Sequence, residues 1–237
     1  MENQVQNIKV LFLHGLESGV QGSKANYLRK NFKEVCVPDL KISVYKLNKQ
    51  NSILRKLLFN PKNWLSPRMA GLDSLQCCVD IAQQQIKQFN PDIIVGSSMG
   101  GAIACSILAG LKEKQFQKGE NQWQGSVLLL APALDYYLQK TWNQSLQEQW
   151  KQILAQNLQN STNRYDIQIY HGDLDDTVPL QNSNDLIKLC PQIKLEILQG
   201  GDHRLNSSLI DNNKLKEIII KQVQEYQQKQ GIQQQPK

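Results

Sequence analysis

Short apolar runs rich in β-branched residues recur along the chain, and most are followed by a segment with apolar residues at helical spacing. Runs of this length, bounded by turn residues, predict buried strands of a parallel sheet. The alternation of such strands with helices predicts a single α/β domain, with a mostly parallel, doubly wound sheet and helices on both faces. We expect strands at residues 8–13, 35–37, 93–95, 126–131, 167–170 and 195–198, and helices at 23–32, 72–89, 102–111, 182–189 and 214–226.

Two longer segments interrupt this alternation. Residues 41–70 mix basic side chains with leucines and two prolines, and connections of this length usually serve a function or are disordered. Residues 134–160 are helix-prone and rich in aromatic side chains. We interpret both as insertions that form a small or partial lid. Residues 1–226 then make up the domain, and the Gln-rich stretch 227–237 is a tail.

Charge and cysteine content exclude several classes of protein. The net charge is +6, but the basic residues are scattered, and a nucleic-acid-binding surface would need a denser basic stripe with aromatic residues between the charges. No apolar run is long enough to span a bilayer, and the N-terminus has no signal-peptide pattern. The five cysteines show no C-x-x-C spacing, which favours a reducing compartment. We therefore expect a cytoplasmic protein without a transmembrane segment and without nucleic-acid partners.

The stretch around Ser98 carries the first chemical signal. Gly96, Ser98 and Gly100 form a G-x-S-x-G pattern between the predicted strand at 93–95 and the helix that follows. This pattern suits a sharp strand-to-helix turn that exposes a serine hydroxyl above the sheet. The alternative interpretation is a Gly/Ser-rich turn in an ordinary αβ unit.

The three histidines of the chain each follow a predicted strand. His14, His171 and His203 therefore belong, with Ser98, to loops at the carboxyl ends of parallel strands, which open on one crevice. A serine becomes a nucleophile only when a base accepts its proton and a third group orients that base. A metal site could be drawn from His171, Asp173 and His203, but no metal-ligand spacing supports it, and we expect neither a metal nor a cofactor.

The order of these residues resembles that of the α/β-hydrolase superfamily. Ser98 comes first, an acid follows within 171–179, and His203 comes last. The small YqiA-like esterase branch is similar in further motifs, among them Lys24-Ala25 and Gly200-Gly201-Asp202-His203. The resemblance spans residues 10–203 and implies an α/β-hydrolase fold.

The resemblance also implies roles for individual residues. Asp175 is the triad acid by position, and Asp173, Asp176 and, more distantly, Asp135 are alternatives. Ser98 is then the nucleophile and His203 the base. The backbone N–H groups of Leu16 and Met99 would bind the oxyanion. A separate expectation concerns four aromatic residues that either wall a substrate pocket or pack in the core, Tyr136, Tyr137, Trp142 and Trp150, of which the first three are the candidate pocket residues.

These inferences combine into one prediction of function. We expect a serine hydrolase that cleaves a small-molecule carboxylic ester or thioester through an acyl-enzyme intermediate. An amidase or peptidase would use the same residues and is one alternative. The main alternative is a catalytically silent scaffold with the same fold, because a fold alone does not establish chemistry. Such a scaffold would use the 41–70 segment to contact a protein partner.

Overall fold

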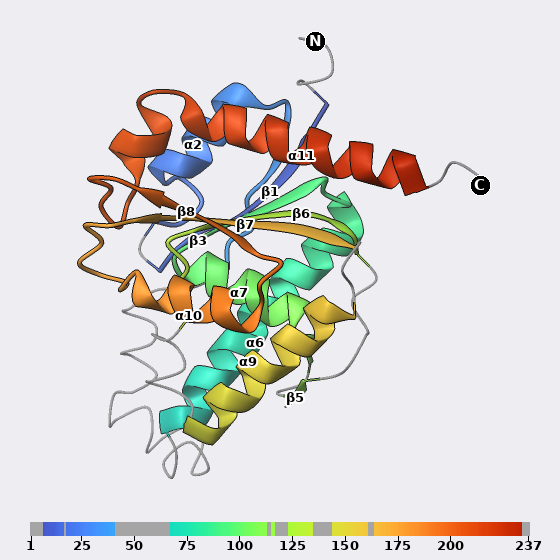
Figure 1. Ribbon diagram of the computed structural model, residues 1–237, viewed down its shortest axis with the longest axis vertical. Helices are drawn as coiled ribbons and strands as arrows, with labels where there is room; N and C mark the ends of the chain where they lie inside the picture. The colour runs from blue at the N-terminus through green and yellow to red at the C-terminus, as the bar shows by residue number, and fades with distance from the viewer. Residues whose placement is uncertain are drawn as a thin grey trace.

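The computed structural model describes residues 7–16, 18–40, 67–112, 115–116, 123–134, 144–160 and 164–233. Its centre is a six-stranded sheet with the order β2-β1-β3-β6-β7-β8 (Figure 1). Every neighbouring pair of strands in this sheet is parallel, as the apolar runs predict. The strands are β1 (Lys9–Leu13), β2 (Glu34–Cys36), β3 (Ile93–Ser97), β6 (Gly125–Leu130), β7 (Tyr165–Gly172) and β8 (Lys194–Leu198).

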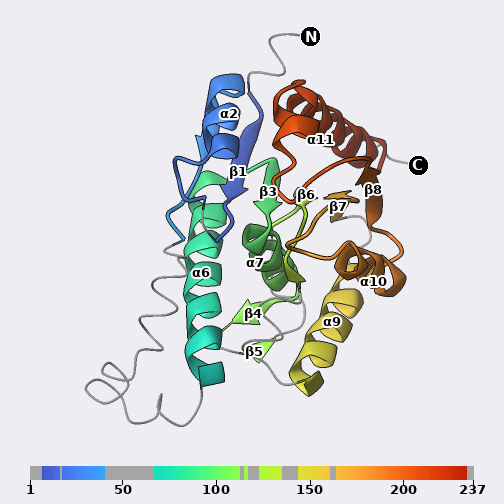
Figure 2. The same cartoon turned by 90° about the vertical axis from the view of Figure 1, so that its left-hand side faces the viewer.

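Helices cover both faces of the sheet (Figures 1 and 2). On one face lie α2 (Ser23–Asn31) and α11 (Lys214–Gln233). On the other lie α6 (Pro67–Phe89), α7 (Met99–Leu108), α9 (Gln144–Gln159) and α10 (Gln181–Leu189). This three-layer arrangement confirms the predicted doubly wound α/β architecture.

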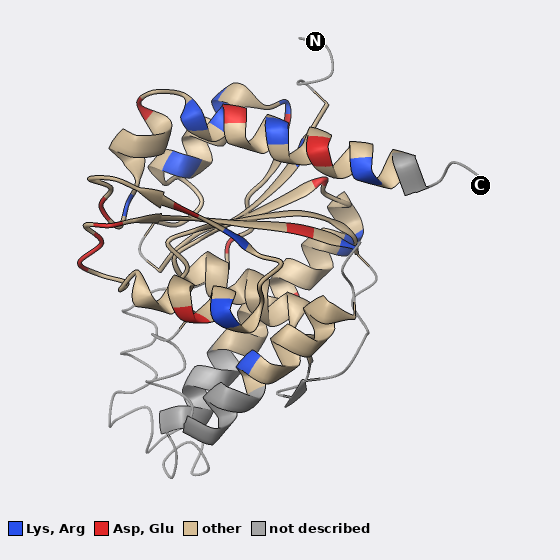
Figure 3. Cartoon of the chain, viewed as in Figure 1, with Lys and Arg blue, Asp and Glu red and all other residues tan. Residues whose placement is uncertain are grey.

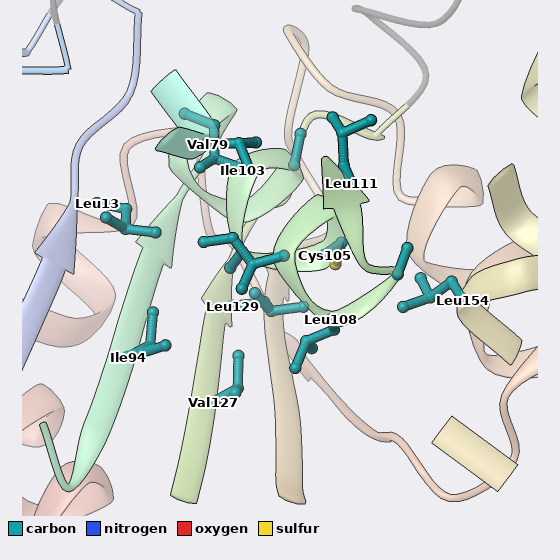
Figure 4. Packing of buried hydrophobic residues seen from close by; sticks show 14 of the residues in the cluster. Leu13, Val79, Ile94, Ile103, Cys105, Leu108, Leu111, Val127, Leu129 and Leu154 are labelled. Carbon is teal, nitrogen blue, oxygen red and sulfur yellow. The ribbon is translucent and has the colours of Figure 1, made fainter. Parts of the chain in front are cut away.

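Alternation along the strands divides the core into two layers. Leu11 and Ile94 pack on the side of α6 and α7, whereas Val10 and Phe12 pack on the side of α2 and α11. Every residue of α7 is buried, because this helix lies between the sheet and the outer helices. Figure 4 shows side chains of the α7 side of the core, which include Leu13, Val79, Ile103, Leu108, Leu129 and Leu154.

The strand order changes direction between β1 and β3. From β1 the chain adds β2 on one side, and then places β3, β6, β7 and β8 on the other. Ligands of open α/β sheets bind in the crevice outside the carboxyl ends of the strands at such a point. His14 follows β1 and Ser98 follows β3, so two of the candidate residues lie at this point.

Several element boundaries differ from the predicted ones. Helix α6 begins at Pro67 instead of residue 72, so the last part of the 41–70 segment is helical; proline is well tolerated in the first turn of a helix. Helix α7 ends at Leu108 because Gly110 adopts a positive φ of 74° just beyond it. A two-stranded antiparallel pair then follows that the apolar pattern did not predict, β4 (Leu111–Lys112) with β5 (Gln115–Phe116).

The predicted tail also needs correction. Helix α11 continues past Tyr226 to Gln233, so the first part of the 227–237 stretch is helical. Gln and Lys are good helix formers, and the helix can therefore extend beyond its apolar face. Residues 41–66 and 135–143 lie outside the described part of the chain. The lid prediction for these residues, and with it the roles of Asp135, Tyr136, Tyr137 and Trp142, remains a prediction.

Charged residues are distributed over both helical layers. Basic and acidic positions alternate on α11, and both signs occur on α10 across the sheet (Figure 3). Among the described helices, none is both long and apolar enough to cross a membrane.

Candidate active site

Ser98 lies in a strained turn between β3 and α7. Its backbone angles are φ 54° and ψ −113°, which L-residues seldom adopt. The Ser98 N–H donates to the Leu130 carbonyl at 2.8 Å, and the Ser98 carbonyl accepts from the N–H groups of Gly101 at 3.0 Å and Ala133 at 2.9 Å. These bonds hold a conformation that costs about 1–3 kcal/mol, and such strain is common where a side chain must be presented to a ligand.

Gly100 allows α7 to begin close against β1. A Cβ atom at this position would collide with the Leu13 carbonyl oxygen. At Gly96, a Cβ would lie 2.7 Å from the Gly100 carbonyl oxygen. The glycines of the G-x-S-x-G pattern are therefore required by close backbone packing.

The structure brings Ser98, His203 and Asp175 together in one hydrogen-bonded chain. The Ser98 hydroxyl donates to Nε2 of His203 at 3.0 Å. Nδ1 of His203 donates to Oδ2 of Asp175 at 2.8 Å. Because a carboxylate can only accept here, Nδ1 carries the proton and Nε2 is the acceptor. This arrangement can transfer a proton from the hydroxyl to the imidazole.

The side chain of Asp175 is completely buried, and both of its oxygens accept hydrogen bonds. Oδ1 accepts from the backbone N–H groups of Thr177 at 2.9 Å and Val178 at 2.7 Å. Oδ2 is shared by His203 and, at 3.1 Å, by Nε2 of His171. A buried carboxylate needs such partners, because an unpaired charge away from water is strongly destabilising.

His171 connects the loop after β7, which carries Asp175, to α10. Its Nε2 lies 2.9 Å from the Val178 carbonyl, so this nitrogen carries a proton and donates to that oxygen, and it also lies 3.1 Å from Oδ2 of Asp175. Its Nδ1 accepts from the Ser183 hydroxyl at 2.8 Å. The Val178 contact lies within the loop that follows β7, whereas Ser183 lies on α10, and no sequence signal pointed to this second contact.

The alternative acids make other contacts. Oδ1 of Asp173 accepts from the Gly200 N–H at 2.7 Å, and Asp176 accepts from the Thr177 hydroxyl at 3.1 Å. Asp202, next to His203 in the chain, accepts from the Leu205 N–H at 2.7 Å. Of the acids whose side chains are described in this region, only Asp175 is hydrogen-bonded to His203.

His14 stabilises the loop after β1. Its Nδ1 donates to the Gly15 carbonyl at 2.9 Å, and its Nε2 accepts from the Leu40 N–H at 3.4 Å. The neighbouring Gly15 passes close to Ser98, since a Cβ at position 15 would lie 3.2 Å from the Cβ of Ser98. His14 thus shapes the loop that carries Leu16.

A cavity of about 600 Å³ opens above Ser98. Leu16 and Met99, the residues predicted to supply oxyanion donors, both line it. Nothing in the sequence pattern marked Arg204 as a pocket residue, and Lys24 was noted only as part of a motif. Besides Ser98 and His203, the lining includes Phe12, Leu16, Lys24, Met99, Thr177, Val178, Arg204 and Asn206. Across the part of the chain that the structure describes, no cluster of three or more His, Cys, Asp or Glu residues could hold a metal ion.

The six-stranded parallel sheet, with helices on both faces and the serine turn after β3, defines the class of this protein as an α/β hydrolase. A family model for "Serine hydrolase (FSH1)" matches residues 1–208. The chain therefore belongs to the FSH1 serine hydrolase family. The superfamily resemblance is confirmed, whereas the likeness to the YqiA-like branch remains only a resemblance.

Solved structures agree on the fold. A hydrolase from Agrobacterium vitis S4 is 18% identical with a TM-score of 0.58, covering 93% of this chain and 89% of its own. A carboxylesterase of the thaumarchaeon Nitrososphaera gargenis is 11% identical with a TM-score of 0.56, covering 93% and 92%. Est1E from Butyrivibrio proteoclasticus is 16% identical with a TM-score of 0.53, covering 94% and 91%. Among curated proteins, none matches the chain.

Proposed function

We propose that this serine hydrolase cleaves a carboxylic ester or thioester through an acyl-enzyme intermediate, with Ser98 as nucleophile, His203 as general base and Asp175 as the orienting acid. The observation that carries the proposal is the pair of hydrogen bonds, 3.0 Å from Ser98 to His203 and 2.8 Å from His203 to Asp175. A serine hydroxyl needs such a base and orienting group before it can attack a carbonyl.

In the first half of the reaction, the Ser98 oxygen bonds to the acyl carbonyl carbon while its proton moves to Nε2 of His203. The carbonyl oxygen becomes negatively charged. The backbone N–H groups of Leu16 and Met99 would bind this oxyanion, and one such donor is typically worth ~3 kcal/mol of barrier. The intermediate then collapses, and the leaving alcohol or thiol takes the proton from His203.

In the second half, water replaces the leaving group. His203 accepts a proton from the water as its oxygen attacks the acyl carbon, and the proton returns to Ser98 when the ester bond to the enzyme breaks. Asp175 remains ionised throughout and stabilises the imidazolium that forms twice per cycle. The acid is released, and the enzyme returns to its starting state.

A fluorophosphonate probe tests the nucleophile directly. The wild-type protein is expected to be labelled, and Ser98→Ala is not. The matched control is Ser207→Ala, which removes an exposed hydroxyl that does not line the cavity and should leave labelling intact. Labelling that persists in Ser98→Ala would remove the assignment.

Turnover separates an enzyme from a silent scaffold. Short-chain 4-nitrophenyl esters and an acyl thioester should be hydrolysed by the wild-type protein, with the rate abolished in His203→Ala. A folded wild-type protein that hydrolyses no member of the panel would favour the scaffold alternative.

A further inference from the structure

The cavity above Ser98 carries two cationic side chains and, among its described lining residues, no carboxylate. Lys24 comes from the first turn of α2, and Arg204 directly follows His203 in the chain. The remainder of the lining is neutral or apolar apart from His203, with Phe12 and Leu16 supplying apolar surface. A pocket with one sign of charge concentrates ligands of the opposite sign.

Lys24 is held at the pocket by its contact with the loop that carries the base. Its Nζ donates to the Arg204 carbonyl at 2.5 Å, which joins α2 to the residues just after His203. Burial lowers the pKa of Lys24 to about 8, while the carboxylate of Asp202 raises it and the guanidinium of Arg204 lowers it further. The ammonium group is thus mostly protonated at neutral pH, in a partly desolvated place where an anionic partner is favourable.

Asp202 forms no ion pair with Lys24 or Arg204, although it lies near Arg204 in the chain. One of its carboxylate oxygens accepts from the Leu205 N–H at 2.7 Å, and Asp202 is not among the residues that line the cavity. Within the described residues, neither the Lys24 ammonium nor the Arg204 guanidinium forms an ion pair with an acid. Both cations can therefore contact a ligand in the cavity.

We propose that Lys24 and Arg204 form an anion-recognition site inside the catalytic pocket, so that the preferred substrate is an ester or thioester bearing a carboxylate or phosphate. This inference rests on the proposed function, because the substrate must present its carbonyl to Ser98 while its anionic group reaches the two cations. Lys24 and Arg204 are specificity-determining residues in this scheme and take no part in proton transfer.

The test compares esters that differ only in charge. The mono-4-nitrophenyl esters of adipic, suberic and sebacic acid carry a free carboxylate, and their methyl 4-nitrophenyl diesters are the neutral counterparts. The expected wild-type result is a kcat/KM about tenfold higher for the best anionic ester than for its neutral counterpart. A second arm compares acetyl-coenzyme A with acetyl-pantetheine, and thus places the anion in the leaving group instead of the acyl chain.

Variants of Lys24 and Arg204 test whether these two residues cause the preference for anionic esters. Lys24→Met and Arg204→Met should each reduce the anionic-to-neutral ratio severalfold, and Lys24→Arg should restore most of it. The matched control is Lys30→Met, which removes an exposed charge from the same helix α2 and should leave the ratio unchanged. Should Lys24→Met fail to fold, Arg204→Met and the wild-type salt dependence still decide the question, because the preference should shrink as ionic strength rises.

The pH dependence of the ratio gives an independent readout. As pH rises through about 8, Lys24 loses its proton and the anionic preference should decline, whereas arginine side chains stay charged. Equal kcat/KM values for charged and neutral esters in both arms, with no effect of Lys24→Met or Arg204→Met, would overturn the inference and leave the esterase proposal intact. Failure to hydrolyse any ester or thioester would instead reject the proposed function itself.

Discussion

Nε2 of His171 lies 3.1 Å from Oδ2 of Asp175, the same oxygen that accepts the hydrogen bond of His203, and both side chains are fully buried. The side chain that orients the proposed base is therefore itself held by a second histidine. Since His171 is fixed by the Ser183 hydroxyl on α10, the position of the acid depends on how the loop after β7 packs against that helix.

Replacing His171 should weaken both stability and catalysis. In His171→Phe, the Val178 carbonyl and the Ser183 hydroxyl lose their hydrogen-bond partner, and Asp175 loses its contact with Nε2. A buried polar group left unsatisfied costs about 1–3 kcal/mol. We expect a lower free energy of unfolding by chemical denaturation, and a kcat/KM reduced roughly tenfold because the acid is less well positioned. Ser183→Ala removes only the outer contact and should have a smaller effect on both. Wild-type kcat/KM in His171→Phe would show that the second histidine is dispensable.

The choice of acid among neighbouring aspartates is testable by two matched substitutions. Asp175→Asn retains the shape of the side chain, but removes the charge that stabilises the imidazolium and disturbs the tautomer of His203. Loss of this acid in a serine triad lowers kcat by roughly 10⁴-fold. Asp176→Asn, one residue later and exposed, should stay close to wild type. Steady-state hydrolysis of a 4-nitrophenyl ester measures both, and similar losses in the two variants would contradict the assignment.

The close approach of α7 to β1 predicts a large stability effect at Gly100. The Cβ of Gly100→Ala would collide with the backbone oxygen of Leu13, which cannot move without displacing the centre of the sheet. We expect a loss of at least about 3 kcal/mol in the free energy of unfolding, or failure to fold. Gly231→Ala is the control: no atom lies within 4 Å of its new Cβ, and a helical alanine should stabilise α11 by up to about 1 kcal/mol. A folded Gly100→Ala variant of wild-type stability would disprove the packing argument.

Much of the fold could be predicted because burial leaves a strong local pattern. The strands at the centre of the sheet are short runs that are apolar on both faces, such as Ile93, Ile94 and Val95. The pair β4–β5 could not be predicted in the same way, since strands of two residues are too short to show a period. The extension of α11 was missed because its last turns are polar, and propensity without an apolar face is a weak signal.

The residues of the candidate site could likewise be predicted only where they lie in a local sequence motif. Ser98 and His203 lie in local motifs with recognisable turn residues, whereas Asp175 was placed by the resemblance to the α/β-hydrolase superfamily. The contact of His171 with Ser183 depends on how a loop returns to a helix, and the presence of Lys24 beside Arg204 depends on two segments far apart in sequence meeting at the pocket. Local patterns do not encode such distances, so these relationships emerge only from the structure.

Burial should make the five cysteines react unequally. Cys77 is exposed on α6, whereas its neighbour Cys78 is buried, and burial raises the pKa of the Cys78 thiol to about 12. Burial likewise raises the pKa of the Cys190 thiol to about 11, and it also raises the pKa of the Cys105 thiol. These three thiols should therefore stay almost entirely protonated at pH 8. They should react slowly, because the thiolate is the reactive form.

Limited treatment of the folded protein with iodoacetamide at pH 8, followed by peptide mass spectrometry, is expected to modify Cys77 first. Cys78, Cys105 and Cys190 should remain unmodified until denaturant is added. Cys77→Ser is the control and should remove the rapid phase of the reaction. The remaining thiols of this variant should still react with iodoacetamide in denaturant. In the native structure, the Cys78 thiol is buried and donates to the Leu40 carbonyl at 3.2 Å. Rapid alkylation of Cys78 in the native state would contradict this contact and show that α6 separates readily from Leu40.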